Sequence, residues 1–165
     1  LQMALATAAV ANGGVLWHPQ LVEQICDGAG VCREIPVAAV GRVPVADSLL
    51  AVVREGMKGA VQRGTAAGVD ASDLDLAGKT GTVENSPTTD NPEGRNHTWF
   101  TSFAPASDPD LVVTVFLEKS GGYGGGLAAP VAADVVREWK AIQADRRPTQ
   151  VLPVPDWDQA ETRPQ

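Results

Sequence analysis

Residues that commonly hold metals are scarce in this sequence. The 165 residues include two His and two Cys, whereas a structural zinc site needs about four such ligands. Basic residues are also few, because 13 Lys and Arg stand against 20 Asp and Glu and give a net charge of −7. This balance argues against a nucleic-acid partner, since a phosphate backbone is bound by accumulated positive charge.

Long hydrophobic runs are absent as well. The longest apolar runs, such as residues 111–117, fall far short of the roughly 20 residues that a membrane-spanning helix requires. No basic segment followed by an apolar one opens the sequence, as it would in a secretory leader. The sequence does contain 44% hydrophobic residues, 17 Gly and 12 Pro, a composition typical of a globular protein.

Apolar periodicity predicts three helices and three β-strands. The helices are expected over residues 1–12, 47–65 and 127–144, and the strands over residues 76–84, 98–104 and 111–118. The first helix is apolar on more than one face, which suits a helix buried in a larger body. Because Leu1 has no capping residue ahead of it, we expect the chain to begin inside a domain.

Two segments predict irregular structure near the end of the chain. Residues 121–126 contain five Gly and predict a flexible connection before the last helix. Residues 145–165 contain four Pro and little periodicity, which predicts an irregular tail. The expected organisation is therefore one folded portion over residues 1–144 and a Pro-rich tail over residues 145–165.

The two cysteines flank a predicted turn. Two short strands are expected over residues 21–26 and 31–35, around a turn that contains two Gly. A hairpin in register would set Cys26 opposite Cys32, close enough for a disulfide. A disulfide would favour an oxidising, extracytoplasmic compartment. Two free thiols and a metal site are the other interpretations of this pair.

The most specific run in the sequence is LAGKTGT, residues 76–82. Because side chains alternate along a strand, Lys79 and Gly81 should face one way and Thr80 and Thr82 the other. Gly lets a ligand backbone lie close to the strand, Lys supplies a cation, and Thr hydroxyls suit a carboxylate. Free N–H groups on an edge strand can polarise a carbonyl oxygen. These are the parts of an acyl-transfer site; the alternative is an ordinary surface strand with an exposed Lys.

Five elements follow one another in a recognisable order. They are LQMALATAAVANGG followed by a Pro, a helix ending in Gly-Thr-Ala, AGKTGT, HTWFTSFAPASDPDLVVTVFLE, and a Gly-rich turn before AAPVA and the last helix. Over residues 1–144 the chain resembles the C-terminal half of the transpeptidase domain of a high-molecular-weight penicillin-binding protein, most like the class B type. The resemblance implies an α/β (α+β) fold, an antiparallel sheet with flanking helices, as part of the serine β-lactamase and penicillin-binding-protein fold.

The resemblance also implies an activity. It points to a serine-type peptidoglycan D,D-transpeptidase that cross-links stem peptides ending in D-Ala-D-Ala and is acylated by β-lactam antibiotics. Lys79, Thr80 and Thr82 would bind the terminal carboxylate, and Gly81 would keep the strand open to it. The backbone N–H of Thr82 would be one half of the oxyanion hole. No cofactor or metal is implied.

The same resemblance implies a cellular setting. The expected place is the extracytoplasmic face of the bacterial cell membrane, in the periplasm or cell-wall space. An anchor would lie upstream of Leu1. A membrane glycosyltransferase would be a partner.

The nucleophile of that family has no counterpart in this sequence. None of the six Ser is followed three residues later by Lys, and no Ser-x-Asn occurs; the six are Ser48, Ser72, Ser86, Ser102, Ser107 and Ser120. We therefore expect the chain alone to be inactive and to work with the N-terminal half of the same protein. The alternatives are a fragment of a class A β-lactamase or D,D-carboxypeptidase, and a non-catalytic module that binds peptidoglycan or a divisome partner.

Weaker candidates lie around the long polar stretch, residues 85–97. A connection of this length is usually functional or disordered, so the stretch is expected to shape substrate access, with Arg95 as a contact. His97 at its end is a candidate general base. Trp99 and Phe100 should alternate faces, so that one enters the core while the other lines the site.

Overall fold

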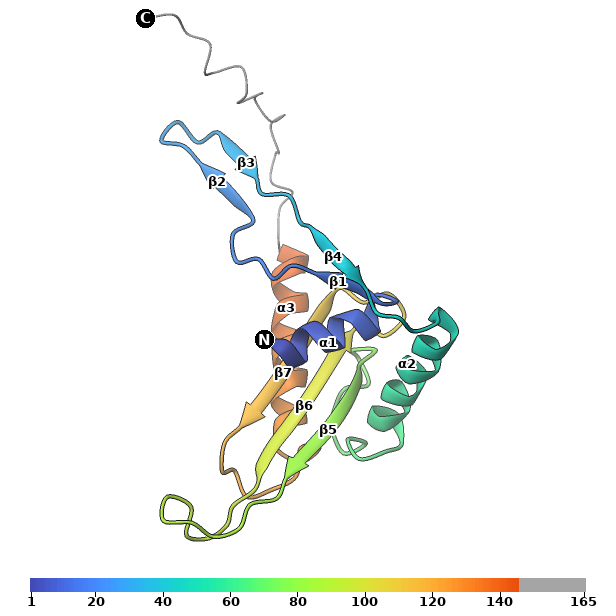
Figure 1. The fold of residues 1–165 in the computed structure, drawn as a ribbon, viewed down its shortest axis with the longest axis vertical. Coiled ribbons are helices and arrows are strands. Elements are labelled where there is room, and N and C mark those ends of the chain that lie inside the picture. The colour runs from blue at the N-terminus through green and yellow to red at the C-terminus, as the bar shows by residue number, and fades with distance from the viewer. Residues whose placement is uncertain (146–165) are drawn as a thin grey trace, which may run out of the picture.

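Three antiparallel strands form the central sheet of the computed structural model, which describes residues 1–145 (Figure 1). They are β5 (Ala77–Val83), β6 (His97–Ala104) and β7 (Leu111–Leu117), in the order β5-β6-β7. All three strands were predicted, with bounds that differ by one residue at most. The predicted tail, residues 145–165, lies outside the described residues except for Asp145.

Three helices flank this sheet, and all three were predicted. They are α1 (Gln2–Ala11), α2 (Asp47–Gln62) and α3 (Ala128–Asp145). Figure 1 shows α3 on one face of the sheet and α1 on the other, with α2 beside β5. The expected class, an antiparallel sheet with flanking helices, is confirmed. None of the helices in residues 1–145 is long and apolar enough to cross a membrane.

The main core lies between the sheet and α3. Phe100 on β6 is fully buried and clusters with Ala129, Ala132 and Val136 of α3. Burying such an aromatic side chain stabilises the fold by roughly 1.5–3 kcal/mol. Gly78 makes room for it, because a Cβ at this position would fall 2.8 Å from Phe100 Cε2. The glycine before the Lys-Thr-Gly run is therefore required by packing.

Hydroxyl groups and small residues join α1 to the opposite face. Thr7 Oγ1 and Thr101 Oγ1 lie 2.7 Å apart, and Thr101 Oγ1 lies 2.7 Å from Thr114 Oγ1. This hydrogen-bonded row crosses from α1 over β6 to β7. Nearby, Ala11 of α1 packs in a cluster with Phe103 of β6. The arrangement fixes α1 on the face that also carries the Lys79 side chain.

An arm made of two short ribbons, residues 15–42, projects from this body (Figure 1). In the inner ribbon β1 (Val15–Trp17) pairs with β4 (Ala39–Arg42); in the outer one β2 (Gln24–Cys26) pairs with β3 (Cys32–Glu34). The outer strands are shorter than predicted, and the inner pair was not predicted. Cys26 pairs with Cys32 in register, and their sulfur atoms are bonded at 2.01 Å.

The Gly-rich segment before α3 differs from the prediction. Residues 121–126 were expected to be a flexible connection, but Gly124 is buried and its carbonyl accepts the backbone N–H groups of Ala128 and Ala129 at 3.1 and 2.9 Å. A Cβ on Gly124 would lie 2.7 Å from the Gly81 carbonyl oxygen. The prediction is wrong because glycine here permits close packing against β5.

Candidate active site

The Lys-Thr-Gly-Thr run lies on β5, an edge strand. Within residues 1–145, β5 pairs with β6 alone, so its other edge has no strand partner. Cross-strand register places Lys79 and Gly81 on the sheet face that carries α1, and Thr80 and Thr82 on the face that carries α3. The alternation expected from the sequence is therefore the one that the strand adopts.

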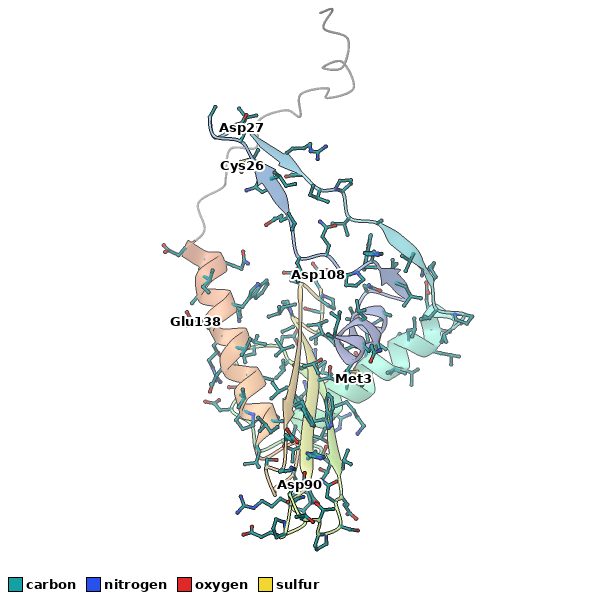
Figure 2. All side chains as sticks on the ribbon, turned by 60° about the vertical axis from the view of Figure 1, so that its left-hand side comes forward. Met3, Cys26, Asp27, Asp90, Asp108 and Glu138 are labelled. Carbon is teal, nitrogen blue, oxygen red and sulfur yellow. A yellow bond between two sulfur atoms is a disulfide. The ribbon has the colours of Figure 1, made fainter. Side chains whose placement is uncertain are left out.

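A pocket of about 260 Å³ opens beside this strand. It brings together three of the four predicted site residues and three further ones from α1 and β6: Lys79, Thr80, Gly81, Met3, Trp99 and Thr101. Thr82, the fourth predicted residue, is exposed and does not line the pocket. The lining thus combines one basic residue, two Thr and one Gly with the apolar residues Trp99 and Met3 (Met3 is labelled in Figure 2).

Both polar side chains at the centre of the run have internal partners. Lys79 Nζ donates a hydrogen bond to the Thr80 carbonyl oxygen at 2.6 Å. Thr80 Oγ1 lies 2.8 Å from Thr65 Oγ1, in the turn that follows α2. The ammonium group therefore lies along β5, while the turn after α2 supplies a hydroxyl next to that of Thr80. A carboxylate bound here would find a cation and hydroxyl donors within one stretch of strand.

Gly81 and its cross-strand partner Trp99 shape the pocket floor. A Cβ at Gly81 would lie 3.1 Å from Trp99 Cβ, so this glycine leaves room for the indole as well as for a ligand. The Trp99 ring lies 4.3 Å from the Phe116 ring, centroid to centroid. Phe100 is buried in the core while Trp99 lines the pocket. The prediction that one of these aromatic residues enters the core is confirmed, and the other lines the pocket beside the motif.

The two weaker candidates do not line this pocket. His97 Nδ1 accepts the backbone N–H of Lys119 at 2.9 Å, and its ring lies 5.5 Å from Phe116. Because Nδ1 is occupied as an acceptor, the imidazole proton is placed on Nε2. Arg95 Nε lies 2.6 Å from Glu93 Oε2, within the connection between β5 and β6. The structure gives both residues local structural contacts.

The connection between β5 and β6 is held by an ion pair at its far end, where Figure 2 labels Asp90. Lys119 Nζ lies 2.7 Å from Asp90 Oδ2. The hydrogen bond from Lys119, with a second from Thr88, lowers the pKa of Asp90 from 3.8 to about 2. The same bond raises the pKa of Lys119.

Asn91, in the same connection, is buried and exchanges side-chain hydrogen bonds with the Arg95 backbone at 2.9 Å. The connection is therefore internally bonded along much of its length.

Two pocket residues and one neighbour of the pocket were not connected with the motif by the sequence. Met3 of α1 and Thr101 of β6 line the pocket, and Thr65, in the turn after α2, is bonded to Thr80. The pairing of Lys79 with Thr101 follows from hairpin register, and could have been found by counting outward from the connection between their strands. The position of Met3 depends on how α1 docks, for which no local signal exists. Among residues 1–145, no cluster of three or more His, Cys, Asp or Glu could hold a metal ion.

Comparison with known proteins gives consistent matches. The penicillin-binding protein transpeptidase domain family model matches residues 1–137. Peptidoglycan D,D-transpeptidase PbpA of Mycolicibacterium smegmatis is 36% identical over 141 residues, which are 79% of this chain and 27% of that protein. The chain spans about a quarter of the length of the curated relatives it matches.

Solved structures match as well. The D,D-transpeptidase domain of a peptidoglycan glycosyltransferase from Eggerthella lenta is 29% identical with a TM-score of 0.73, covering 86% of this chain and 32% of that one. The ceftriaxone acyl-enzyme complex of penicillin-binding protein A from Mycobacterium tuberculosis is 31% identical with a TM-score of 0.64, covering 81% and 30%.

Proposed function

This chain belongs to the penicillin-binding protein transpeptidase domain family, and we propose that it supplies the substrate-binding strand of a peptidoglycan D,D-transpeptidase. The observation that carries the proposal is the placement of the Lys-Thr-Gly-Thr run on an edge strand beside a pocket. An edge strand can pair with an extended peptide through its main chain, which suits a stem peptide as substrate.

In this proposal Lys79 and Thr80 bind the terminal carboxylate of the stem peptide or of a β-lactam. The Lys79 ammonium, now on the Thr80 carbonyl at 2.6 Å, lies beside the position that such a carboxylate would take. A carboxylate adds attraction between opposite charges that a neutral carbonyl lacks, so the carboxylate would replace the carbonyl as the acceptor. Gly81 leaves the strand without a Cβ at the point where the ligand backbone passes.

Thr82 acts through its backbone. The hydrogen bond from Lys79 Nζ to the Thr80 carbonyl oxygen supports the inference that this carbonyl points toward the free edge of β5. N–H and C=O groups of alternate residues point to the same edge of a strand. The Thr82 N–H then faces that edge too, where it would donate to the oxyanion of the tetrahedral intermediate.

The nucleophile comes from outside this sequence in our proposal. The sequence contains neither Ser-x-x-Lys nor Ser-x-Asn, and an oxyanion donor accelerates acyl transfer only when a nucleophile attacks the same carbonyl. We therefore assign the serine to the N-terminal half of the same protein, with residues 1–144 as the C-terminal portion of its transpeptidase domain. Catalysis needs no cofactor or metal in this proposal.

The proposed setting is the outer face of the bacterial cell membrane. The protein would be anchored by an upstream segment and would act beside a membrane glycosyltransferase that makes the glycan strands. The disulfide between Cys26 and Cys32 supports a compartment that is oxidising.

Labelling with a fluorescent penicillin tests the proposal. We expect stable labelling of the full-length protein and no labelling of residues 1–165 alone, because the acylated serine lies elsewhere. If the full-length protein fails to label, the enzyme proposal is wrong. If the label is released within seconds, the chain belongs to a β-lactamase-like hydrolase instead, since a transpeptidase holds its β-lactam adduct.

A further inference from the structure

Apolar side chains are exposed along most of the arm, residues 15–42. The outer ribbon and the segments that join it to the inner ribbon carry Leu21, Val22, Ile25 and Val37, all exposed. The Leu21 side chain is fully exposed within residues 1–145. Monomeric proteins rarely expose contiguous apolar patches larger than a few hundred Å², and patches of that size mark interaction sites.

The arm is nevertheless ordered by many specific contacts. Gln20 Nε2 donates to the carbonyl oxygens of Val22 and Ile35 at 2.8 and 3.1 Å, and so joins the two chain segments at the base of the outer ribbon. At the tip, Asp27 Oδ1 accepts the N–H groups of Ala29 and Val31, both at 2.9 Å.

The disulfide between Cys26 and Cys32 closes the turn between these anchors. A two-stranded hairpin without a core is marginally stable in water. The outer ribbon packs on no core, and these side-chain hydrogen bonds and the disulfide hold it in one conformation. Such a ribbon can present a preorganised surface to a partner.

A hollow of about 450 Å³ lies at the base of the outer ribbon. Its lining includes apolar Leu21, Val22 and Ile35 together with two carboxylates, Glu23 and Glu34. Within residues 1–145 each arm strand pairs with one neighbour alone, so the outer edges of both ribbons are free to pair with an added strand. The hollow thus offers apolar contact, main-chain hydrogen bonds and negative charge together.

The charges decide between the candidate occupants. The outer ribbon carries Glu23, Asp27 and Glu34 against a single Arg33, so two copies docked by this surface would place like charges together, which is destabilising. An anionic membrane surface would be repelled for the same reason. A basic polypeptide segment meets no such penalty and gains complementary charge.

We propose that the arm is a docking site for an extended polypeptide segment whose apolar side chains are flanked by Lys or Arg. The apolar side chains would fill the hollow beside Leu21 and Ile35, and the basic ones would reach Glu23 and Glu34. The segment's main chain would pair with a free edge of the ribbon. This surface is separate from the Lys79 pocket, so the inference stands whether or not the proposed enzyme activity does.

A phage-displayed library of random short peptides provides the first test. The library is selected on the 165-residue chain and then depleted on its Leu21→Ser variant. We expect enrichment of peptides that combine apolar residues with Lys or Arg. Absence of enrichment, or enrichment of acidic peptides, would overturn the proposal.

An enriched peptide is then titrated by fluorescence anisotropy against matched variants. Truncating a central apolar contact should weaken binding by roughly fivefold or more, so Leu21→Ser should do this. The control is Leu49→Ser, the same substitution at an exposed leucine outside the arm, on α2 (59% exposed). Glu23→Gln with Glu34→Gln should weaken binding at low salt and reduce its salt dependence.

Other results of these measurements would contradict the proposal. Equal losses from Leu21→Ser and Leu49→Ser would mean that binding is not at the arm. Sedimentation of the chain as a dimer that Leu21→Ser dissociates would identify a second copy as the occupant. Binding to vesicles rich in phosphatidylserine that needs Leu21 would identify a lipid surface instead. Circular dichroism of each variant establishes that the fold is retained.

Discussion

Gly124→Ala perturbs the contact between the Gly-rich segment and the motif strand. A Cβ on Gly124 would lie 2.7 Å from the carbonyl oxygen of Gly81 and 3.0 Å from its nitrogen. Both are backbone atoms of β5, which β6 holds in the sheet, so neither can rotate away as a side chain would. On the other side of the segment, a Cβ on Gly125 would lie 3.0 Å from the Thr65 carbonyl carbon. The segment is wedged between β5 and the turn after α2.

The size of the effect follows from two opposing contributions. Forcing an extra methyl group into packed structure costs about 1–3 kcal/mol. Replacing Gly by Ala also restricts the unfolded chain, which returns about 0.4–1 kcal/mol. We therefore expect Gly124→Ala to lower the free energy of unfolding by about 1–2 kcal/mol, or a few degrees in Tm for a chain of this length.

Gly126→Ala is the matched control. The nearest atom to a Cβ at Gly126 is the Tyr123 carbonyl oxygen at 3.8 Å, an ordinary contact distance. Because the unfolded-state contribution is the same, this variant should be as stable as the wild type or slightly more so. Urea unfolding followed by circular dichroism compares the two. If Gly124→Ala unfolds at the same urea concentration as Gly126→Ala, the segment is not wedged as described.

Three further predictions concern the site, the arm and the connection between β5 and β6. In the full-length protein, Lys79→Ala should slow acylation by penicillin about ten- to hundredfold in a stopped-flow assay, because a charge-assisted contact is lost; unchanged acylation would place Lys79 outside the site. Replacing Cys26 and Cys32 by Ser should destabilise the hairpin locally by roughly 2 kcal/mol, seen as faster amide exchange there with an unchanged Tm for the body. Lys119 lowers the pKa of Asp90 from 3.8 to about 2, so Asp90 contributes stability that is present above pH 3.8 and lost as the pH falls through about 2. Amide exchange in the connection between β5 and β6 should follow this pH dependence in the wild type and lose it in Asp90→Asn.

The body of the fold was predictable because its elements carry strong periodicity. Each strand of the sheet was found within one residue, since β-branched and aromatic residues line it and turn residues end it. β1 and β4 were missed for the opposite reason. They are three and four residues long, β4 is exposed throughout, and the pairing contains an irregularity between Leu16 and Trp17. So short and exposed a pairing leaves little apolar pattern in the sequence.

The site residues on β5 were predictable from the sequence, and the pocket residue that α1 contributes was not. The order of Lys79, Thr80 and Gly81 on the strand follows from the sequence, and so does their alternation. Met3, far from β5 in the sequence, reaches the same pocket because Thr7 on its helix bonds to Thr101 on β6. That contact joins residues 94 positions apart, and no local propensity encodes it.

The alternation of side chains along β5 limits how a ligand can bind, and pairing of the ligand with the free edge of the strand removes this limit. Lys79 and Thr82 lie on opposite faces of β5, so no ligand resting on one face can meet both side chains. A ligand that extends the sheet from the free edge lies level with the strand. It then meets the Lys79 side chain from one face, the Thr80 hydroxyl from the other and the Thr82 N–H in the plane of the sheet. Carboxylate binding on one face alone would leave Thr82 idle, so a Thr82→Pro variant, which lacks this N–H, separates the two modes. Edge pairing requires that it abolish acylation of the full-length protein while Thr82→Val, which keeps the N–H, retains it.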